Sequence, residues 1–229
     1  APPAHKMLCF HDFSYPRTQF RVALFAGCSL PQAASALLKN AYARLGYALD
    51  EHPAQTPGLN ASTASLQAQH RNTTLGTLSV NLDRKEGLQA ELLYPREVAE
   101  LRRRGALCEF TKLALDTELA GREVLCSLFY IAYVFSHSVH RAMHLLIEVN
   151  PRHQCFYERM LGFTRIGEER LCHRVGAPAV LMHLDFDFTR RQIERARLGL
   201  SVAGTTLYRY AAPPADEESL VRRISATPS

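Results

Sequence analysis

Long apolar stretches are missing from this sequence of 229 residues. No window holds the ~18 consecutive apolar residues that indicate a membrane-spanning helix. The longest apolar run, Val124 to Phe135, is interrupted by Ser127 and is typical of a buried helix. The first residues also lack the apolar core of a secretory signal. We therefore expect a cytoplasmic protein, and 47 % hydrophobic residues are enough for a sizeable core.

The six cysteines form no CxxC pair, and no Cys/His group has the spacing of a zinc site. Three of them stand in apolar patterns, where reduced cysteine behaves as a small hydrophobe: Cys108, Cys126 and Cys155. Among the ten histidines, His137, His140 and His144 are closely spaced, but no carboxylate completes a pattern such as HExxH. We expect no metal, no disulfide framework, and histidines that serve as ordinary polar positions near a helix end.

The net charge is +5, with 27 Lys and Arg residues against 22 Asp and Glu residues. Arginine dominates over lysine, and its guanidinium makes bidentate contacts to phosphate and carboxylate groups. Nucleic acid, an anionic membrane surface and an acidic protein all fit this charge balance. A solvated basic surface is the simplest interpretation, and we expect no nucleic-acid partner.

The periodicity of the chain predicts strands that alternate with helices. Predicted strands cover 20–26, 65–71, 74–82, 106–116, 143–149, 164–171 and 180–186; predicted helices cover 30–45, 94–104, 124–140, 151–160 and 189–198. This order indicates an α/β domain with a mixed sheet. A loop is expected over 50–64, and Gly76 indicates a bulge or a close backbone approach. We expect an N-terminal arm over 1–19, one domain over 20–187, and a basic helix with a C-terminal tail over 188–229.

Four motifs, spaced along the domain, carry a family resemblance. They read YARLGY at 42–47, LGTLSVNLD at 75–83, YPREVAELRRRGALCEFTKLALD at 94–116 and IEVNPRHQCFYERMLGF at 147–163. Together they resemble the bacterial long-chain N-acyl amino acid synthases, which are GNAT-type acyltransferases related to the acyl-homoserine lactone synthases. The resemblance covers about residues 20–187 and implies a mixed central sheet, flanked by helices, whose two middle strands splay around the acyl thioester.

The resemblance also implies an activity: a long-chain fatty acyl group passes from acyl carrier protein to the amine of an amino acid. The donor would be an acyl-phosphopantetheine thioester, with no tightly bound cofactor. The glycine-rich pyrophosphate loop of coenzyme A-dependent GNAT enzymes is missing, since TELAGR at 117–122 offers only Gly121 and Arg122. Because a carrier-bound pantetheine has a single phosphate, this loop favours the carrier-protein donor, with its helix start set against that phosphate.

Direct attack of an amine on a thioester needs a base for the amine proton and a donor for the oxyanion. Glu109 is the first candidate base because it interrupts an apolar strand, where burial raises a carboxyl pKa. A strand glutamate that faces solvent or pairs with Lys112 is the alternative. Lys112, the second candidate catalytic residue, would act as a charge partner in the site. It stands where the family usually has arginine, and on an ideal strand it points to the opposite face from Glu109 unless a bulge intervenes. Glu148, in the second apolar strand, is an alternative base that more simply faces outward.

The resemblance assigns further residues to the substrate. Leu113, Ala114 and Leu115 would offer backbone groups to the pantetheine arm. Asn150, His153 and Tyr157, around the start of the next helix, are further candidate substrate-binding residues. Either Tyr157 or His153 would lie near the leaving thiol. Structural roles compete here: Asn150 is expected to cap the following helix, and Tyr157 is expected to pack.

Two arginine groups are candidates for docking the acidic carrier protein: Arg102, Arg103 and Arg104 in one, Arg190 and Arg191 in the other. Solvated charge is the competing interpretation for both. For the second group, a peripheral membrane contact is a further alternative, since Ile193 and Leu200 share a helix face.

Three rival functions stay open from the sequence. One is an acyl-CoA-dependent GNAT N-acetyltransferase, which the missing glycine-rich loop disfavours. Another is a lactone autoinducer synthase, for whose sulfonium donor the sequence shows no site. The third is a catalytically silent module that binds a lipid or a carrier protein, against which Glu109 argues.

Overall fold

The computed structural model describes residues 6–16, 18–27, 30–47, 63–200 and 207–226. Most of the loop expected over 50–64 lies outside these residues. The strands are β1 Met7–Tyr15, β2 Thr18–Ala26, β3 Thr63–His70, β4 Thr73–Leu82, β5 Leu107–Leu115, β6 His144–Val149, β7 Thr164–Arg165, β8 Arg170–Cys172 and β9 Ala177–Asp185. The helices are α1 Gln32–Arg44, α2 Pro95–Arg102, α3 Arg122–Tyr133, α4 Gln154–Leu161, α5 Phe186–Arg197 and α6 Pro214–Ser225. Short 3-10 turns lie at Gln89–Leu92 (η2), Pro151–His153 (η4) and Leu207–Tyr210 (η5), and a π-helical segment, Val134–Val139 (η3), extends α3.

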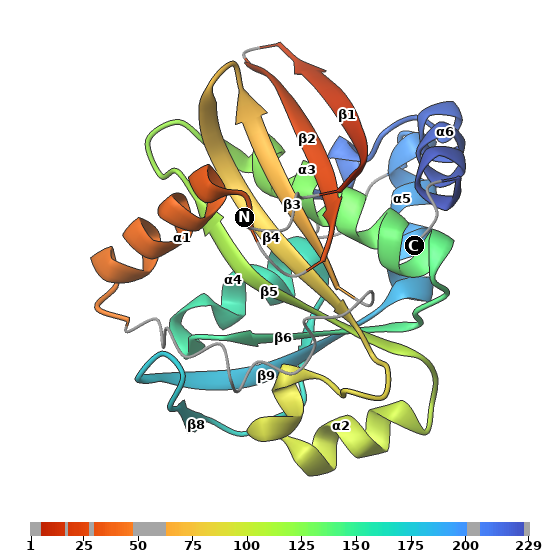
Figure 1. Ribbon diagram of the computed structural model, residues 1–229. Helices are drawn as coiled ribbons and strands as arrows, with labels where there is room; N and C mark the ends of the chain where they lie inside the picture. Colours follow the sequence, from red (N-terminus) through yellow and green to blue (C-terminus); the bar gives the residue numbers. More distant parts are fainter. Residues whose placement is uncertain (1–5, 17, 28–29, 48–62, 201–206, 227–229) are drawn as a thin grey trace.

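One mixed sheet organises the molecule in the order β1-β2-β3-β4-β5-β6-β9-β7, with β8 paired to β9 (Figure 1). Every neighbouring pair is antiparallel except β5 and β6, which run parallel in the middle of the sheet. The predicted α/β class with a mixed central sheet flanked by helices is confirmed.

The expectation of an irregular arm before residue 20 is wrong for Met7–Tyr15, which forms the edge strand β1. This strand pairs with β2 from Met7↔Phe25 to Tyr15↔Thr18. Cys9 and Phe13 face the core, and the intervening Asp12 forms a surface ion pair with Arg21. The alternation of apolar and polar residues is therefore that of a strand with one buried face.

The C-terminal segment also differs from the expected tail, because Pro214–Ser225 forms helix α6. Leu220 and Ile224 of this helix are buried in the main core, and Arg223 donates a hydrogen bond to the carbonyl of Phe10 in β1. The two ends of the described chain are thus packed against each other and complete the core that residues 20–187 begin.

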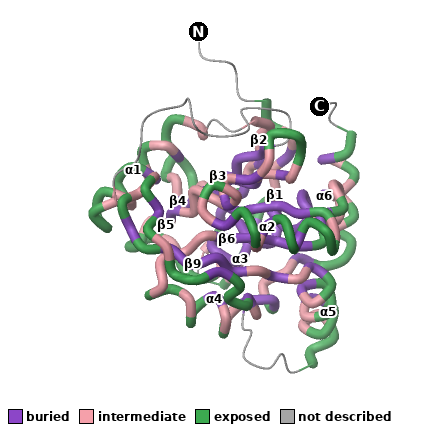
Figure 2. The backbone as a smooth tube through the Cα atoms, turned by 90° about the horizontal axis from the view of Figure 1, so that it is seen from below, coloured by how far each residue is buried: buried purple, intermediate pink, exposed green. Residues whose placement is uncertain are grey.

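Two apolar clusters occupy opposite faces of the sheet. In β6, Leu145 and Ile147 belong to the larger cluster, whereas Leu146 between them belongs to the smaller one, as the two-residue period of a strand requires. Helices α3, α5 and α6 cover the larger cluster; α2 and η2 cover the smaller one. Figure 2 shows the buried segments in the middle of the molecule and the exposed outer surfaces of α1, α5 and α6.

Gly76 has the structural role that the sequence indicated. It lies beside two register shifts of β4, one against β3 and one against β5. A Cβ atom at this position would come within 2.7 Å of Leu115 and 3.0 Å of Leu128. The absence of a side chain therefore lets α3 and β5 pack closely against β4.

None of the helices in the described part of the chain combines the length and apolar character needed to cross a membrane.

Candidate active site

The two middle strands separate within the sheet. The pairs between β5 and β6 are Leu107↔His144, Cys108↔Leu145 and Glu109↔Leu146, and no pair follows in these two fully described strands. Beyond Glu109, β5 continues along β4, while β6 continues along β9. The predicted splay is therefore present, with Glu109 at the last paired position and a gap between the carboxyl ends of both strands.

A β-bulge at Lys112 shapes the β5 side of this gap. Ser79 pairs with Thr111 and Thr77 with Ala114, so two residues of β5 oppose one residue of β4. Lys112 has a φ of 52°, which few residues other than glycine adopt. Because of the extra residue, Phe110, three positions before Leu113, contacts the same apolar cluster as Leu113 and Leu115.

Glu109 is buried, with 2 % of its surface exposed, and its carboxylate is held by three donors. The Oε1 atom accepts hydrogen bonds from the amide of Asn81 at 2.8 Å and the backbone N–H of Gln89 at 2.7 Å; Oε2 accepts one from Ala90 N–H at 3.0 Å. In the structure, Glu109 neither faces solvent nor pairs with Lys112, so both alternative interpretations are wrong. The carboxylate thus anchors the start of η2 at the apex of the gap.

Burial raises the pKa of Glu109, and nearby Glu148 raises it further, while the hydrogen bonds from Asn81, Gln89 and Ala90 lower it. The net direction is upward because desolvation of the charged form is the largest cause. A carboxylate with a raised pKa is a stronger base once it has lost its proton.

Glu148 lies on the same face of the sheet as Glu109, two residues beyond Leu146, the partner of Glu109. It accepts a hydrogen bond at 2.7 Å from Arg174, which follows β8. The Glu148 side chain is 12 % exposed and that of Arg174 is 33 % exposed. The expectation that Glu148 simply faces outward is therefore wrong, and the pair forms a charged, partly open wall beside Glu109.

Two hydroxyl groups extend this polar face. Ser79 and Thr111 are directly opposite each other across β4 and β5. Their Oγ and Oγ1 atoms are buried, and neither has a hydrogen-bond partner among the described residues. Sequence reasoning missed these hydroxyls, Asn81 and Arg174, although the alternation of Thr77, Ser79 and Asn81 within β4 already marked one polar face.

The other predicted substrate residues surround the open end of the gap. Gly121 is the N-cap of α3 and Arg122 its first residue; both are exposed and follow the end of β5. Asn150 caps η4 as expected, because its side chain accepts from the N–H of Arg152 at 3.2 Å. His153 ends η4 and is also exposed.

Tyr157 is buried in α4, with its ring 6.4 Å from that of Phe129 and 5.7 Å from that of Phe163. The structural expectation for Tyr157, that it packs, is confirmed. Leu113, Ala114 and Leu115 lie in the part of β5 that has separated from β6.

The two arginine groups predicted to dock a carrier protein lie at the opposite, closed end. Arg102 forms ion pairs with Asp83 and Glu91, which precede β5 in the chain, and Arg104 pairs with Glu100. Three exposed residues complete these groups: Arg103, Arg190 and Arg191. Because α5 starts where β9 ends, beside His144, its N-terminal half, which carries Arg190 and Arg191, also lies towards the closed end. These residues therefore do not surround the gap.

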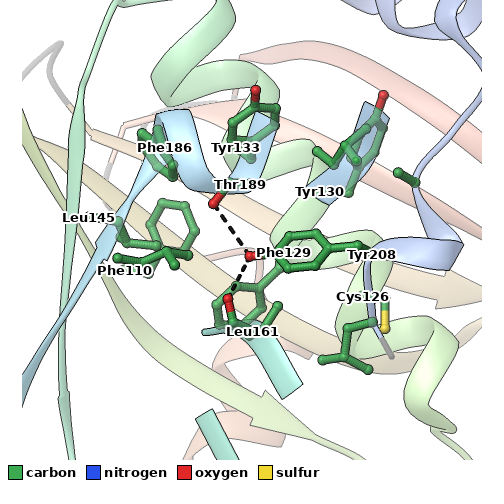
Figure 3. Close-up of a pocket in the computed structure, with 14 residues that line it drawn as sticks. Phe110, Cys126, Phe129, Tyr130, Tyr133, Leu145, Leu161, Phe186, Thr189 and Tyr208 are labelled. Carbon is green, nitrogen blue, oxygen red and sulfur yellow. Dashed lines mark hydrogen bonds between the residues drawn. The ribbon is translucent and has the colours of Figure 1, made fainter. Parts of the chain in front are cut away.

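An apolar cavity lies beside the apex of the gap, on the opposite face from Glu109. Figure 3 shows the side chains that line it. Phe110 and Leu145, at the apex, form one part of its wall. The remainder of the wall comes from α3, α4, β9, α5, η5 and Ala211, the residue after η5. The cavity volume is about 40 Å³. The cavity is thus narrow, apolar and adjacent to the point where the strands separate.

Among the described residues, no three His, Cys, Asp or Glu side chains gather in a way that could hold a metal ion. All described cysteines are free thiols: Cys9, Cys108, Cys126, Cys155 and Cys172. Cys155 is exposed on α4, so the interpretation of this residue as part of an apolar pattern is wrong.

A histidine pair at the closed end leads us to expect that the stability of the protein depends on pH. His183 Nε2 lies 3.1 Å from His144 Nδ1, and Asp185 and Arg104 are also close enough to act on its charge. Burial, followed by the neighbouring His144, lowers the pKa of His183 to about 4. Between this value and the ordinary histidine pKa of ~6.5, the unfolded chain binds a proton that the folded chain does not.

Stability should therefore be complete above pH ~6.5 and fall as the pH drops towards 4, by ~1–3 kcal/mol after allowance for partial exposure. Urea unfolding of the wild type and of His183→Gln at both pH values measures this. The variant, which keeps a hydrogen-bonding side chain but cannot gain a proton, should lose less stability on acidification. An equal loss in both proteins would show that other groups are responsible.

Comparisons with known proteins agree with this geometry. A family model described as N-acyl amino acid synthase FeeM matches residues 33–185. The solved structure of FeeM, an N-acyl amino acid synthase from uncultured soil microbes, is similar with a TM-score of 0.61 and 30 % identity, over 68 % of this chain and 90 % of that chain.

Two further structures share less sequence with the chain. An uncharacterised protein from Bacillus halodurans has a TM-score of 0.55 and 9 % identity, over 84 % of this chain and 98 % of that chain, which shows a shared fold alone. An acyl-CoA N-acyltransferase from Pseudomonas aeruginosa has a TM-score of 0.47 and 14 % identity, over 71 % of this chain and 97 % of that chain. No curated protein matches the sequence. Since the family match covers more than half of the 229 residues and includes the splayed strands, the chain is a GNAT-type acyltransferase and belongs to the FeeM family of N-acyl amino acid synthases.

Proposed function

We propose that this enzyme transfers a long-chain fatty acyl group from acyl carrier protein to the amine of an amino acid, by direct attack on the thioester. One observation carries the proposal: the gap between β5 and β6 opens beside an apolar cavity on one face and beside buried Glu109 on the other. A thioester at the apex would thus meet an apolar space for its chain and a carboxylate for the amine. The FeeM relative is an N-acyl amino acid synthase, which supports the product class.

The donor enters from the open end. Its pantetheine arm lies along the separated part of β5, where Leu113, Ala114 and Leu115 supply backbone groups. The single phosphate meets the start of α3 at Gly121 and Arg122, where the first backbone N–H groups of a helix favour an anion. A second exposed arginine, Arg152, follows β6 on the other side of the gap. We assign the contact with the acidic carrier protein to this end, in place of the arginine groups at the closed end.

The acceptor amino acid occupies the polar face. Its charges complement the Glu148–Arg174 pair, with the carboxylate on the guanidinium and the ammonium group towards the carboxylates. Unpartnered Thr111 and Ser79 offer hydroxyl groups within the same face. A polar site of this kind rejects acceptors that lack the matching groups, because its own buried groups would then lose their partners.

Glu109 acts as the base. Its Oε2 atom accepts only one hydrogen bond among the described residues, so it has room to accept a second from the amine or from one intervening water. Glu109 takes one proton from the ammonium group and passes it to solvent. The amine nitrogen bonds to the thioester carbon, the carbon–sulfur bond breaks, and the second proton that the nitrogen loses goes to the leaving thiolate. No covalent acyl-enzyme forms.

Incubation of the purified protein with palmitoyl acyl carrier protein and a mixture of amino acids tests this function. Mass spectrometry should detect N-palmitoyl amino acids and identify the preferred acceptor. Parallel incubations with palmitoyl-CoA and acetyl-CoA separate the donor classes. Product from acetyl-CoA alone would overturn the long-chain proposal, whereas equal product from palmitoyl-CoA would overturn only the carrier-protein donor.

A further inference from the structure

The apolar cavity is closed by a part of the chain that lies outside the family match. Eight of its lining residues belong to the family region at 33–185, and the remaining six follow it. These six are Phe186, Thr189, Ile193, Leu207, Tyr208 and Ala211, from α5, η5 and the residue after η5. The family fold therefore provides the entrance to the cavity beside the splayed strands, and this chain provides its own far wall.

Tyr208 is the residue of that wall that connects the surrounding elements. It stands in η5, with 6 % of its surface exposed. Its hydroxyl donates a hydrogen bond of 2.6 Å to the carbonyl of Leu161, at the end of α4, and lies 3.4 Å from Thr189 Oγ1 in α5 (Figure 3). The phenol ring thus reaches from η5 to α4 and α5, and both contacts hold it in one position.

The hydrogen bond to Leu161 has a structural consequence. Leu161 is the last residue of α4, and carbonyl groups in the last turn of a helix have no partner within the helix. Tyr208 supplies such a partner inside the protein, where an unsatisfied carbonyl group is unfavourable. An acyl chain that enters past Phe110 and Leu145 would therefore meet a ring that cannot turn aside without losing this bond.

We infer that Tyr208 limits the length of the acyl chain that the enzyme accepts. The inference rests on the proposed function, because it places the acyl chain in this cavity. A donor whose chain ends before the ring leaves Tyr208 in place; a longer one must displace the ring. One methylene group too many in an apolar pocket lowers kcat/KM by about tenfold or more.

The test uses acyl carrier proteins loaded with saturated acyl groups of graded length, offered together to the full chain. Tyr208→Ala and Tyr208→Leu remove the ring to different degrees, and mass spectrometry gives the length distribution of the products. Both variants should shift the distribution to longer chains, with a rise of about tenfold or more in kcat/KM for the first length that the wild type rejects. The larger shift should come from alanine, which leaves more space.

Two control variants distinguish the effect of added space in the cavity from a general disturbance of the fold. Tyr208→Phe keeps the ring and loses only the hydroxyl. The longest acyl chain that it accepts should therefore be closer to that of the wild type than the longest chain accepted by the alanine variant. Tyr210→Ala removes a tyrosine from the same short helix, but this residue packs against Tyr15, with 5.6 Å between ring centroids, and does not line the cavity. It should leave the length distribution unchanged.

Calorimetric titration with free fatty acids of graded length gives a readout that does not depend on turnover. If the wild type forms N-acyl products and the length distribution is the same in Tyr208→Ala and Tyr208→Leu, the length limit lies elsewhere and the inference is overturned. If the wild type forms no product, the proposed function fails, and the titration decides about the cavity. Tighter binding of longer fatty acids to the two variants would then support the assignment of Tyr208 as the end of the cavity, and unchanged affinities would reject it.

Discussion

Glu109→Gln should lower kcat for amide formation by about 10²–10⁴-fold, the usual contribution of a general base, while donor affinity stays close to that of the wild type. The amide of glutamine occupies the same space, but it cannot take a proton from the amine. The change is measured as the initial rate of N-acyl amino acid formation, together with the affinity for palmitoyl acyl carrier protein.

The pH profile distinguishes loss of a base from loss of structure. The wild-type rate should fall as the pH drops through the raised pKa of Glu109, because only the deprotonated carboxylate can act. The residual rate of the variant should lack this dependence. A purely structural role would lower the rate by the same factor at every pH.

Glu109 also holds the start of η2, so the variant needs a control for stability. Replacing one carboxylate oxygen by an NH₂ group places a donor opposite donors, at a cost of ~1–3 kcal/mol. Glu97→Gln is a matched control: Glu97 is in α2, has a side chain 19 % exposed and pairs with Arg170, away from the gap. It should keep its activity. An active, folded Glu109→Gln protein would exclude Glu109 as the base and make Glu148→Gln the next variant.

Gly162→Ala should lower the free energy of unfolding by ~2–5 kcal/mol, through two causes that add. Gly162 ends α4 with a φ of 79°, in the left-handed region that costs other residues ~1–2 kcal/mol. In addition, a Cβ atom would come within 2.4 Å of the Phe188 ring in α5. Overpacking of this kind costs ~1–3 kcal/mol when the neighbour has to move.

Gly176→Ala separates the two causes. Gly176 also has a positive φ, 63°, but nothing lies within 4 Å of a Cβ atom there. Urea unfolding should show a loss of only ~1–2 kcal/mol for this variant. If both variants lose the same stability, contact with Phe188 contributes nothing. Because Gly162 follows Leu161, whose carbonyl holds Tyr208, a shift of α4 in Gly162→Ala should also weaken the length selection of the cavity.

Several features of the structure could be predicted from short stretches of the sequence. The strand and helix order, the hairpin of β3 and β4, the close approach at Gly76 and the cap at Asn150 were predicted, because each depends on periodicity or on the backbone preference of one residue. The two strands of the gap were also identified, together with Glu109 as the polar residue within the first of them. These signals lie within a few consecutive residues.

Other features join residues that are far apart in the chain. Pairing of Glu148 with Arg174, the contact of Tyr208 with Leu161, and the packing of β1 against α6 could not be predicted, because nothing in the local pattern names the partner. Terminal segments with a weak apolar period resemble loose ends until a neighbour buries them. The partners of Glu109 likewise came from β4 and η2, not from Lys112 three positions away.

The sequence by itself determined the class of fold, the family and the strand that carries the buried carboxylate, since alternation and spaced motifs are properties of the chain alone. Only the tertiary structure decided which end of the gap is open, which arginines lie beside it and where the apolar cavity ends. Those properties depend on the direction and register of strands that meet in space. The hydrophobic period determines on which face of a strand a residue lies, but it does not determine which residue of another element lies next to it.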